Sequence, residues 1–155
     1  METRRLRYDE MAEAASVHRA AFDERLPWLS GRYTPAQDAT YFAERVFHAC
    51  QVWGAVSRTR ILGIVAFREG WIEQLYVLPL CQGAGVGTRL LDVARARQRN
   101  LRLWTFRRNT RARRFYEKQG FVAIEQTDGT RNEEGEPDIL YEWCSMNGAR
   151  RSSAA

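Results

Sequence analysis

The sequence has few of the features that mark membrane-spanning, secreted or metal-binding chains. Its three cysteines, Cys50, Cys81 and Cys144, are an odd number and lack the paired spacing of a zinc site, so neither a disulfide framework nor a metal is predicted. The first twenty residues alternate charge and alanine and show no signal-peptide apolar stretch. Its apolar runs are too short to cross a bilayer. We therefore expect a soluble protein in the reducing cytoplasm.

Lysine is nearly absent as well, since Lys118 stands alone beside 23 arginines. Apolar residues make up 45% of the chain and aromatic residues 12%, which is too much for a disordered protein. The length of 155 residues is that of one domain. We expect a single domain over residues 1–146, followed by a mobile C-terminal tail at residues 147–155.

Positive charge is concentrated in one stretch of the sequence. Residues 89–118 hold ten arginines and one lysine against two acids, a net charge of +9, whereas residues 1–88 are neutral and residues 119–155 carry −4. Such a field predicts a polyanion nearby, which could be a nucleic acid, a membrane surface or a phosphorylated cofactor. A solvated arginine-rich helix face is the alternative explanation.

Hydrophobic periodicity and turn residues predict alternating helices and strands without an internal repeat. We expect strands at residues 4–8, 51–57, 61–68, 71–78, 101–106, 121–126 and 138–144. We expect helices from an Asp9 cap to just before Pro27, from Pro35 to about Cys50, from the glycines near residue 86, and from an Asn109 cap to Gly120.

The clearest chemical signal is the glycine-rich turn Gln82-Gly-Ala-Gly-Val-Gly87 between a strand and a helix. Glycine lets the backbone approach a ligand closely, and the N–H groups of the turn converge at the positive end of the helix dipole, which favours an anion. A phosphate loop of the GxxxxGK[ST] type is excluded because Thr88, not lysine, follows Gly87. A dinucleotide fingerprint lacks its third glycine, although an NADP site using Arg107 and Arg108 stays open.

The same turn, preceded by Leu75-Tyr-Val-Leu-Pro79, resembles the acyl-CoA motif of the GNAT superfamily of N-acyltransferases, read as Gln82-x-x-Gly85-x-Gly87. Downstream, Asn109-Thr-Arg-Ala-Arg-Arg-Phe-Tyr-Glu-Lys-Gln-Gly-Phe121 resembles the second signature of that family. The two signatures, in the right order, span about residues 71–126. The resemblance implies an α/β fold with a mixed, largely antiparallel sheet of six to seven strands and about four flanking helices. It also implies a splay between the fourth and fifth strands, where the pantetheine arm of the cofactor inserts.

The resemblance implies acetyl-CoA (coenzyme A) as the cofactor and assigns residues to it. The cofactor's diphosphate would meet the backbone of Gln82, Gly83, Ala84, Gly85, Val86, Gly87 and Thr88. Backbone groups of Leu75, Tyr76 and Val77 would pair with the pantetheine amides like an added strand. Asn109 and Phe115 complete the assignment. The ribose phosphate would meet one of Arg89, Arg107, Arg108, Arg111 and Arg114.

Two residues are candidate catalysts. By resemblance Tyr116 protonates the departing thiolate, while its helix position equally predicts packing against Phe121. An amine acceptor must lose a proton before it attacks, and Glu73, on a strand beside the gap, is the first candidate to take it through water. Strand alternation puts Glu73 on the face of Trp71, Leu75 and Val77, and an exposed strand carboxylate is its alternative interpretation. His18 has a suitable pKa but lies on an apolar helix face, which is typical of a core histidine.

Taken together, the sequence predicts transfer of an acetyl group from acetyl-CoA directly to a primary amine of a small molecule or peptide, without metal and without a covalent enzyme intermediate. Trp28, Tyr33 and Tyr41 are candidates for a wall of the acceptor site, with ordinary packing as the alternative interpretation. The acidic loop with Asp128, Glu133, Glu134, Glu136 and Asp138 is a candidate attractor for a cationic amine, with a solvated turn as the alternative. A monomer or homodimer is expected, without a membrane partner. Two alternatives stay open: a basic nucleic-acid-binding module, a partner that we do not expect, and a coenzyme A-binding regulator without turnover.

Overall fold

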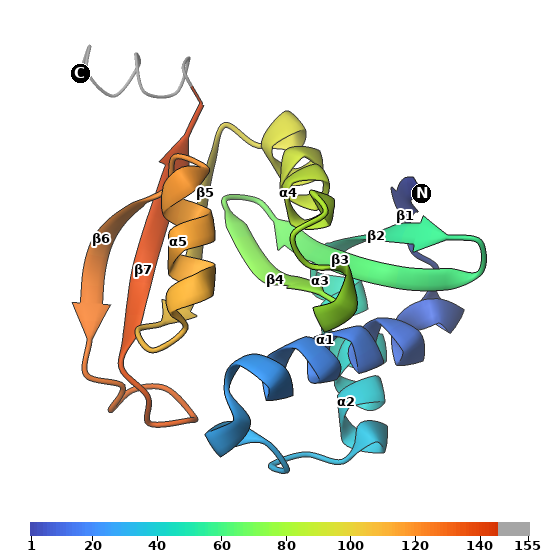
Figure 1. Cartoon of the computed structure of the whole chain (residues 1–155), viewed down its shortest axis with the longest axis horizontal. Helices are drawn as coiled ribbons and strands as arrows, with labels where there is room; N and C mark the ends of the chain where they lie inside the picture. The colour runs from blue at the N-terminus through green and yellow to red at the C-terminus, as the bar shows by residue number, and fades with distance from the viewer. Residues whose placement is uncertain (146–155) are drawn as a thin grey trace. The chain divides into compact units, whose positions relative to one another are not determined.

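The computed structural model describes residues 1–145 (Figure 1), so the predicted tail at residues 147–155 lies outside the described part. The chain forms two compact units. Unit 1 comprises Met1–Arg68 and Ile72–Ala94, and unit 2 comprises Glu69–Trp71 and the described residues from Arg95 onward. The expectation of one domain over residues 1–146 stays a prediction.

The order of elements is the one that the sequence predicts. The strands are β1 (Glu2–Arg5), β2 (Gln51–Ser57), β3 (Arg60–Arg68), β4 (Trp71–Val77), β5 (Asn100–Phe106), β6 (Val122–Thr127) and β7 (Asp138–Cys144). The helices are α1 (Met11–Arg25), α2 (Pro35–Tyr41), α3 (Phe47–Ala49), α4 (Val86–Arg97) and α5 (Thr110–Lys118). No helix among residues 1–145 has the length and apolar character that crossing a bilayer demands.

Seven strands of the described chain follow the order β1-β2-β3-β4-β5-β7-β6. The pairs β1–β2, β2–β3, β5–β7 and β6–β7 are antiparallel, whereas β4 and β5 are parallel and register at one position, Trp71 opposite Arg102. The Arg102 N–H donates to the Gly70 carbonyl at 2.8 Å beside that position. The expected mixed, largely antiparallel sheet, splayed between its fourth and fifth strands, is confirmed.

In unit 1, α1 and α2 cover one face of β2 and β3, and α4 covers the other (Figure 1). The core on the first face joins Met11, Ala14 and Val17 of α1 to Ile61 and Ile64 of β3, all at most 2% exposed. Burying one such aliphatic side chain contributes roughly 1.5–3 kcal/mol to folding. On the other face, a Cβ at Gly63 would lie 3.0 Å from Leu90 of α4, so a glycine is needed there for close packing.

An ion pair joins the two helices on that first face. Arg19 of α1 donates through Nε to Asp38 Oδ2 at 2.8 Å and through Nη2 to Asp38 Oδ1 at 2.9 Å. Asp38 is buried, so the two-pronged geometry compensates for the water that its carboxylate loses. The pair therefore fixes how α1 and α2 pack together.

The start of the chain differs from the prediction. β1 ends at Arg5, residues 8–10 form a 3-10 turn, and α1 begins at Met11, so both the strand at residues 4–8 and the Asp9 cap are wrong. The reason is local bonding by Glu10. Its carboxylate accepts the Arg7 N–H at 2.8 Å and pairs with Arg4 at 2.8 Å, which holds the chain in a turn before the helix. These bonds lower the pKa of Glu10 to about 2.

The second helix runs continuously from Pro35 to Ala49, as predicted, but it contains a wide turn. Thr34 caps it by accepting the Gln37 N–H at 3.1 Å. Residues Phe42–Val46 then form a π-helical segment between α2 and α3. Phe42 and Val46 at its two ends are both buried in the core, so the wide turn brings two apolar side chains onto the same face.

Candidate cofactor and catalytic site

The glycine turn is open on its outer side. Gly83 and Gly85 have φ angles of 84° and 83°, in the left-handed region that glycine tolerates best. A Cβ built on either glycine would meet nothing within 4 Å, and residues 83–85 are exposed. The backbone at this point therefore has room for a ligand to approach it.

The main-chain donors of this turn are available. Within residues 1–145, the N–H groups of residues 83–87 donate no hydrogen bond of normal geometry to another protein atom. A carbonyl group of the turn does form a hydrogen bond, because the Gly85 carbonyl accepts from the Arg89 N–H at 3.1 Å as α4 begins. Unsatisfied N–H groups at the start of a helix attract an anion both by hydrogen bonding and through the helix dipole. The arrangement suits a diphosphate.

The side chain of Gln82 ties this turn to β4. Its Nε2 donates to the Val77 carbonyl at 2.9 Å, and its Oε1 accepts from Arg25 at the end of α1. The strand residues Leu75, Tyr76 and Val77 and the turn residues from Gln82 to Thr88 are thereby brought together in unit 1. Sequence reasoning placed Gln82 at the site, but it gave no sign of the contact with Arg25.

Strict alternation does not hold along β4. Glu73 pairs with Arg68 at 2.7 Å and interacts electrostatically with Tyr41 and Cys50 on the α1–α2 side of the sheet. Tyr76, three residues later, also lies on that side, because its ring contacts His18 of α1 with centroids 4.5 Å apart. Alternation would put residues 73 and 76 on opposite faces. Simple alternation therefore does not predict, along the whole of β4, which residues share a face with Glu73.

His18 is enclosed by aromatic rings in unit 1. Its ring lies near Phe22, Phe42 and Tyr76, and within the described chain its Nδ1 is buried without a hydrogen-bond partner. Desolvation, with the neighbouring Arg19 charge, lowers the pKa of His18 to about 4. A histidine with this pKa is neutral and weakly basic at pH 7. The core interpretation of His18 is the one that this environment favours.

In unit 2, Asn109 and Tyr116 lie on α5 where the sequence predicts them. Asn109 caps the helix by accepting the Ala112 N–H at 3.3 Å. At the other end, the Phe121 N–H donates to the Tyr116 carbonyl at 3.0 Å and the Gly120 N–H to the Glu117 carbonyl at 3.2 Å. With Gly120 at φ 92°, this is a Schellman termination.

The Tyr116 ring is buried in unit 2. It lies 5.5 Å from the Phe121 ring and 5.3 Å from the Phe115 ring, between centroids, so the predicted contact with Phe121 is present. The Tyr141 ring of β7 is 6.3 Å away. Packing thus holds the Tyr116 ring in place. The role of its hydroxyl in protonating the departing thiolate stays a prediction.

A polar network beside Tyr116 had no signal in the sequence. The fully buried Tyr141 donates its hydroxyl to Glu117 Oε2 at 2.6 Å and accepts from Arg113 Nε at 3.3 Å. Burial and the bond to Glu117 raise the pKa of Tyr141 above its usual value of 10.0. Residues 113 and 117 are four apart on a helix, a spacing that predicts neighbours but does not identify a partner on a distant strand.

The charged segments differ in how far they are paired. Arg89, Arg107, Arg108, Arg111 and Arg114 are all exposed, and Arg108 also pairs with Glu136 at 3.5 Å. The acidic loop is largely bonded within itself, since Asp138 accepts from Thr127 and from Asn132, and Asp128 accepts from Thr130. These bonds support the solvated-turn interpretation of that loop.

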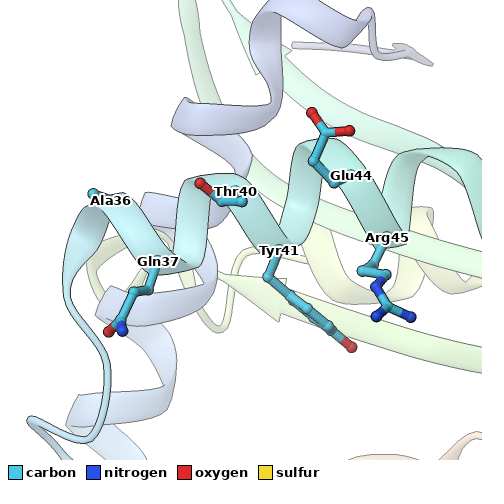
Figure 2. Close-up of a pocket in the computed structure, with 6 residues that line it drawn as sticks. All are labelled: Ala36, Gln37, Thr40, Tyr41, Glu44 and Arg45. Carbon is cyan, nitrogen blue, oxygen red and sulfur yellow. The ribbon is translucent and has the colours of Figure 1, made fainter.

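The candidate acceptor-side aromatics are exposed. Trp28, Tyr33 and Tyr41 are 43%, 39% and 53% accessible. Tyr41 borders an open hollow along α2 and the π-helical segment, lined by Ala36, Gln37, Thr40, Tyr41, Glu44 and Arg45. Figure 2 shows Tyr41 and Arg45 projecting together on one side of this helix and Glu44 on the other. All the residues that line the hollow belong to one helix, so none of them forms an opposite wall.

Comparison with known proteins agrees with these observations. The family described as acetyltransferase (GNAT) domain matches residues 48–123, a range that contains both β4 and the glycine turn. An uncharacterized N-acetyltransferase of Archaeoglobus fulgidus is 46% identical over 57 residues, which are 34% of this chain and 39% of that protein. The chain thus matches well under half the length of this curated relative.

Solved structures share the fold over nearly the whole chain. The solution structure of apo YjaB from Escherichia coli has a TM-score of 0.78 at 22% identity and covers 92% of this chain and 96% of its own. The PaiA N-acetyltransferase of Thermoplasma acidophilum, solved in complex with coenzyme A, has a TM-score of 0.70 at 20% identity, with 93% and 98% covered. The fold and the motif-bearing turn define an acyltransferase-like α/β protein. Residues 48–123 of the chain match the GNAT acetyltransferase domain.

Proposed function

We propose that this chain is an acetyl-CoA-dependent N-acyltransferase whose acceptor is a primary amine of a small molecule or peptide. The observation that carries the proposal is the open turn, where the N–H groups of residues 83–87 donate no main-chain hydrogen bond within residues 1–145 and meet the start of α4. The match of residues 48–123 to the GNAT acetyltransferase domain and a structural neighbour in complex with coenzyme A support it. A diphosphate is the chemical group that such a turn fits.

Each unit contains residues that are candidates to hold the cofactor. In unit 1 they are the main-chain groups of Leu75, Tyr76 and Val77 and of the turn from Gln82 to Thr88. In unit 2 they are Asn109 and Phe115, and an exposed arginine such as Arg107 or Arg114 would meet the ribose phosphate. When bound, acetyl-CoA supplies a thioester, whose carbonyl carbon accepts an amine and whose thiol is a good leaving group.

The protein's own chemistry is proton transfer at two points. A tyrosine hydroxyl is a hydrogen-bond donor, and Tyr116 would donate its proton toward the departing sulfur. Glu73 is held by Arg68 in a strand position that is open to solvent, so a water molecule can carry a proton from the acceptor amine to it. Because a thiol leaves readily, the contribution expected from Tyr116 is modest.

Thiol release is the direct test of the proposal. Purified protein is incubated with acetyl-CoA and a panel of amines, amino acids and peptides, and free coenzyme A is measured. Release that depends on one class of amine supports the function and identifies the acceptor. Tight binding of coenzyme A without release by any amine would instead indicate a regulator, and binding to DNA without affinity for coenzyme A would indicate a nucleic-acid-binding module.

A further inference from the structure

A chain of side-chain hydrogen bonds connects the open turn to the far end of α1. Arg25, the last residue of α1, donates through Nη2 to Gln82 Oε1, and Gln82 Nε2 donates to the Val77 carbonyl at 2.9 Å. Three segments that are distant in sequence thus meet at one amide. They are the end of α1, the end of β4 and the first residue of the turn.

The chemistry of the three groups allows one orientation of this amide. A guanidinium can only donate and a carbonyl can only accept, so the Gln82 oxygen must face Arg25 and its NH2 must face Val77. A flipped amide would place two donors against each other at Arg25. Arg25 is itself restrained, because its Nε donates to Glu24 Oε2 at 2.9 Å and its side chain is 19% exposed. Arg25 therefore fixes the Gln82 side chain.

The turn needs such an anchor because its own residues provide little restraint. Gly83 and Gly85 have no side chains, have open space around them and donate no main-chain hydrogen bond within the described chain. Its conformation is set from its two ends, by the Arg89–Gly85 bond on the α4 side and by Gln82 on the β4 side. A turn that is already ordered binds an anion without the entropic cost of ordering it.

We propose that Arg25 is a positioning residue for the cofactor turn. Through Gln82 it holds the main-chain donors of residues 83–87 in the conformation that receives a diphosphate. This inference rests on the proposed function, since it takes coenzyme A to be the ligand of the turn. It differs from a direct role, in which the guanidinium would itself bind a phosphate independently of Gln82.

A double-mutant cycle on the full chain separates these roles. The dissociation constant of coenzyme A is measured by calorimetry for the wild type, Arg25→Met, Gln82→Met and the double variant. We expect each single variant to bind about tenfold more weakly, because a hydrogen bond to a charged group is lost. The double variant should bind no more weakly than Gln82→Met alone. Arg25→Lys, which keeps a cationic donor, should recover part of the affinity.

The control is Arg5→Met, which removes an exposed positive charge from β1 in the same unit and should leave the affinity unchanged. Unchanged affinity in Arg25→Met would overturn the inference. So would losses that multiply in the double variant, because Arg25 would then act independently of Gln82. If Arg25→Met lost its cooperative thermal transition, the same cycle would be run with Arg25→Lys. A wild type that does not bind coenzyme A would refute the proposed function instead.

Discussion

The turn at residues 82–88 and the loop at residues 128–137 both contain glycines in the left-handed conformation, but the surroundings of Gly83 and Gly85 are opposite to those of Gly129. Around Gly83 and Gly85 a Cβ would meet nothing within 4 Å. At Gly129, which has a φ of 86°, a Cβ would lie 2.3 Å from the carbonyl carbon of Glu136. The missing side chains of Gly83 and Gly85 leave room for a ligand, whereas the missing side chain of Gly129 leaves room only for the backbone of Glu136.

Each segment also has one amide side chain that organises it. Asn132 closes its loop internally, donating to the Glu136 carbonyl at 2.6 Å and accepting the Glu136 N–H at 3.2 Å. Gln82 reaches outward, to Val77 and Arg25, and satisfies none of the N–H groups of its own turn. The comparison teaches that a glycine-rich segment points to a ligand only when its donors are left unsatisfied.

The largest effect should come from Gly129→Ala. The new Cβ collides with the Glu136 backbone in a conformation that disfavours any side chain, so we expect a loss of about 4 kcal/mol in the free energy of unfolding. Denaturant titration measures it. Gly135→Ala is the matched control, since Gly135 is also left-handed, at φ 66°, but has open space, and its cost should be about 1 kcal/mol. Equal losses for the two variants would break the comparison.

In the open turn, Gly85→Val should damage ligand binding more than folding. We expect coenzyme A to bind about a hundredfold more weakly, because a branched side chain blocks close approach to the backbone, with about 1–2 kcal/mol lost in stability. Calorimetry and a thermal melt give the two quantities. Gly31→Val is the control, because Gly31 has the same conformation and the same open space away from the turn. An affinity equal to that of the wild type would remove residue 85 from the site.

Acidification tests stability in unit 1 without changing either turn. The pKa of His18 is about 4 in the folded protein and 6.5 when unperturbed, so the unfolded chain binds the extra proton between these values. Stability therefore falls as the pH drops from 6.5 toward 4, by about 2 kcal/mol at pH 5. Unfolding curves at pH 7 and pH 5 measure the loss. In His18→Gln the difference between the two pH values should shrink; an unchanged difference would assign the acid sensitivity to other groups.

Asn132→Ala should destabilise the closed loop by about 2 kcal/mol, because the partly buried groups of Glu136 and Asp138 that Asn132 satisfies lose their partner. Affinity for coenzyme A should stay at the wild-type value. Gln82→Met is its counterpart in the open turn, with the opposite expectation of weaker binding and little change in stability. A thermal melt and calorimetry on both variants would show whether the two amides really divide these tasks.

The smallest effect is expected for Tyr116→Phe. It should keep the affinity for coenzyme A and lower turnover about tenfold, since a thiol leaves with only modest acid assistance. The rate is measured by thiol release with the best acceptor from the panel. Tyr141→Phe removes another buried hydroxyl of unit 2 and should lower stability without this selective loss of rate. A Tyr116→Phe rate equal to that of the wild type would leave Tyr116 as a packing residue.

The order of elements was predictable from the sequence because each depends on local chemistry. Thr34 and Asn109 cap helices, Gly120 ends one, and Pro79 comes soon after β4, which ends at Val77. The start of α1 was not predictable, because Glu10 prefers Arg4 and Arg7 as partners. The glycine turn was found from residue types alone, whereas the contact of Arg25 with Gln82 joins residues 57 positions apart and leaves no local pattern.

By itself the sequence determined the order of the elements, the GNAT-like motifs and the left-handed Gly120, since these follow from side-chain size, capping and backbone freedom within a few residues. Only the tertiary structure decided which glycines face open space and which face backbone, where alternation along β4 fails, and which buried groups find partners. Those properties depend on atoms that the chain brings together from distant positions. Burial and close packing, not sequence proximity, determine their energies.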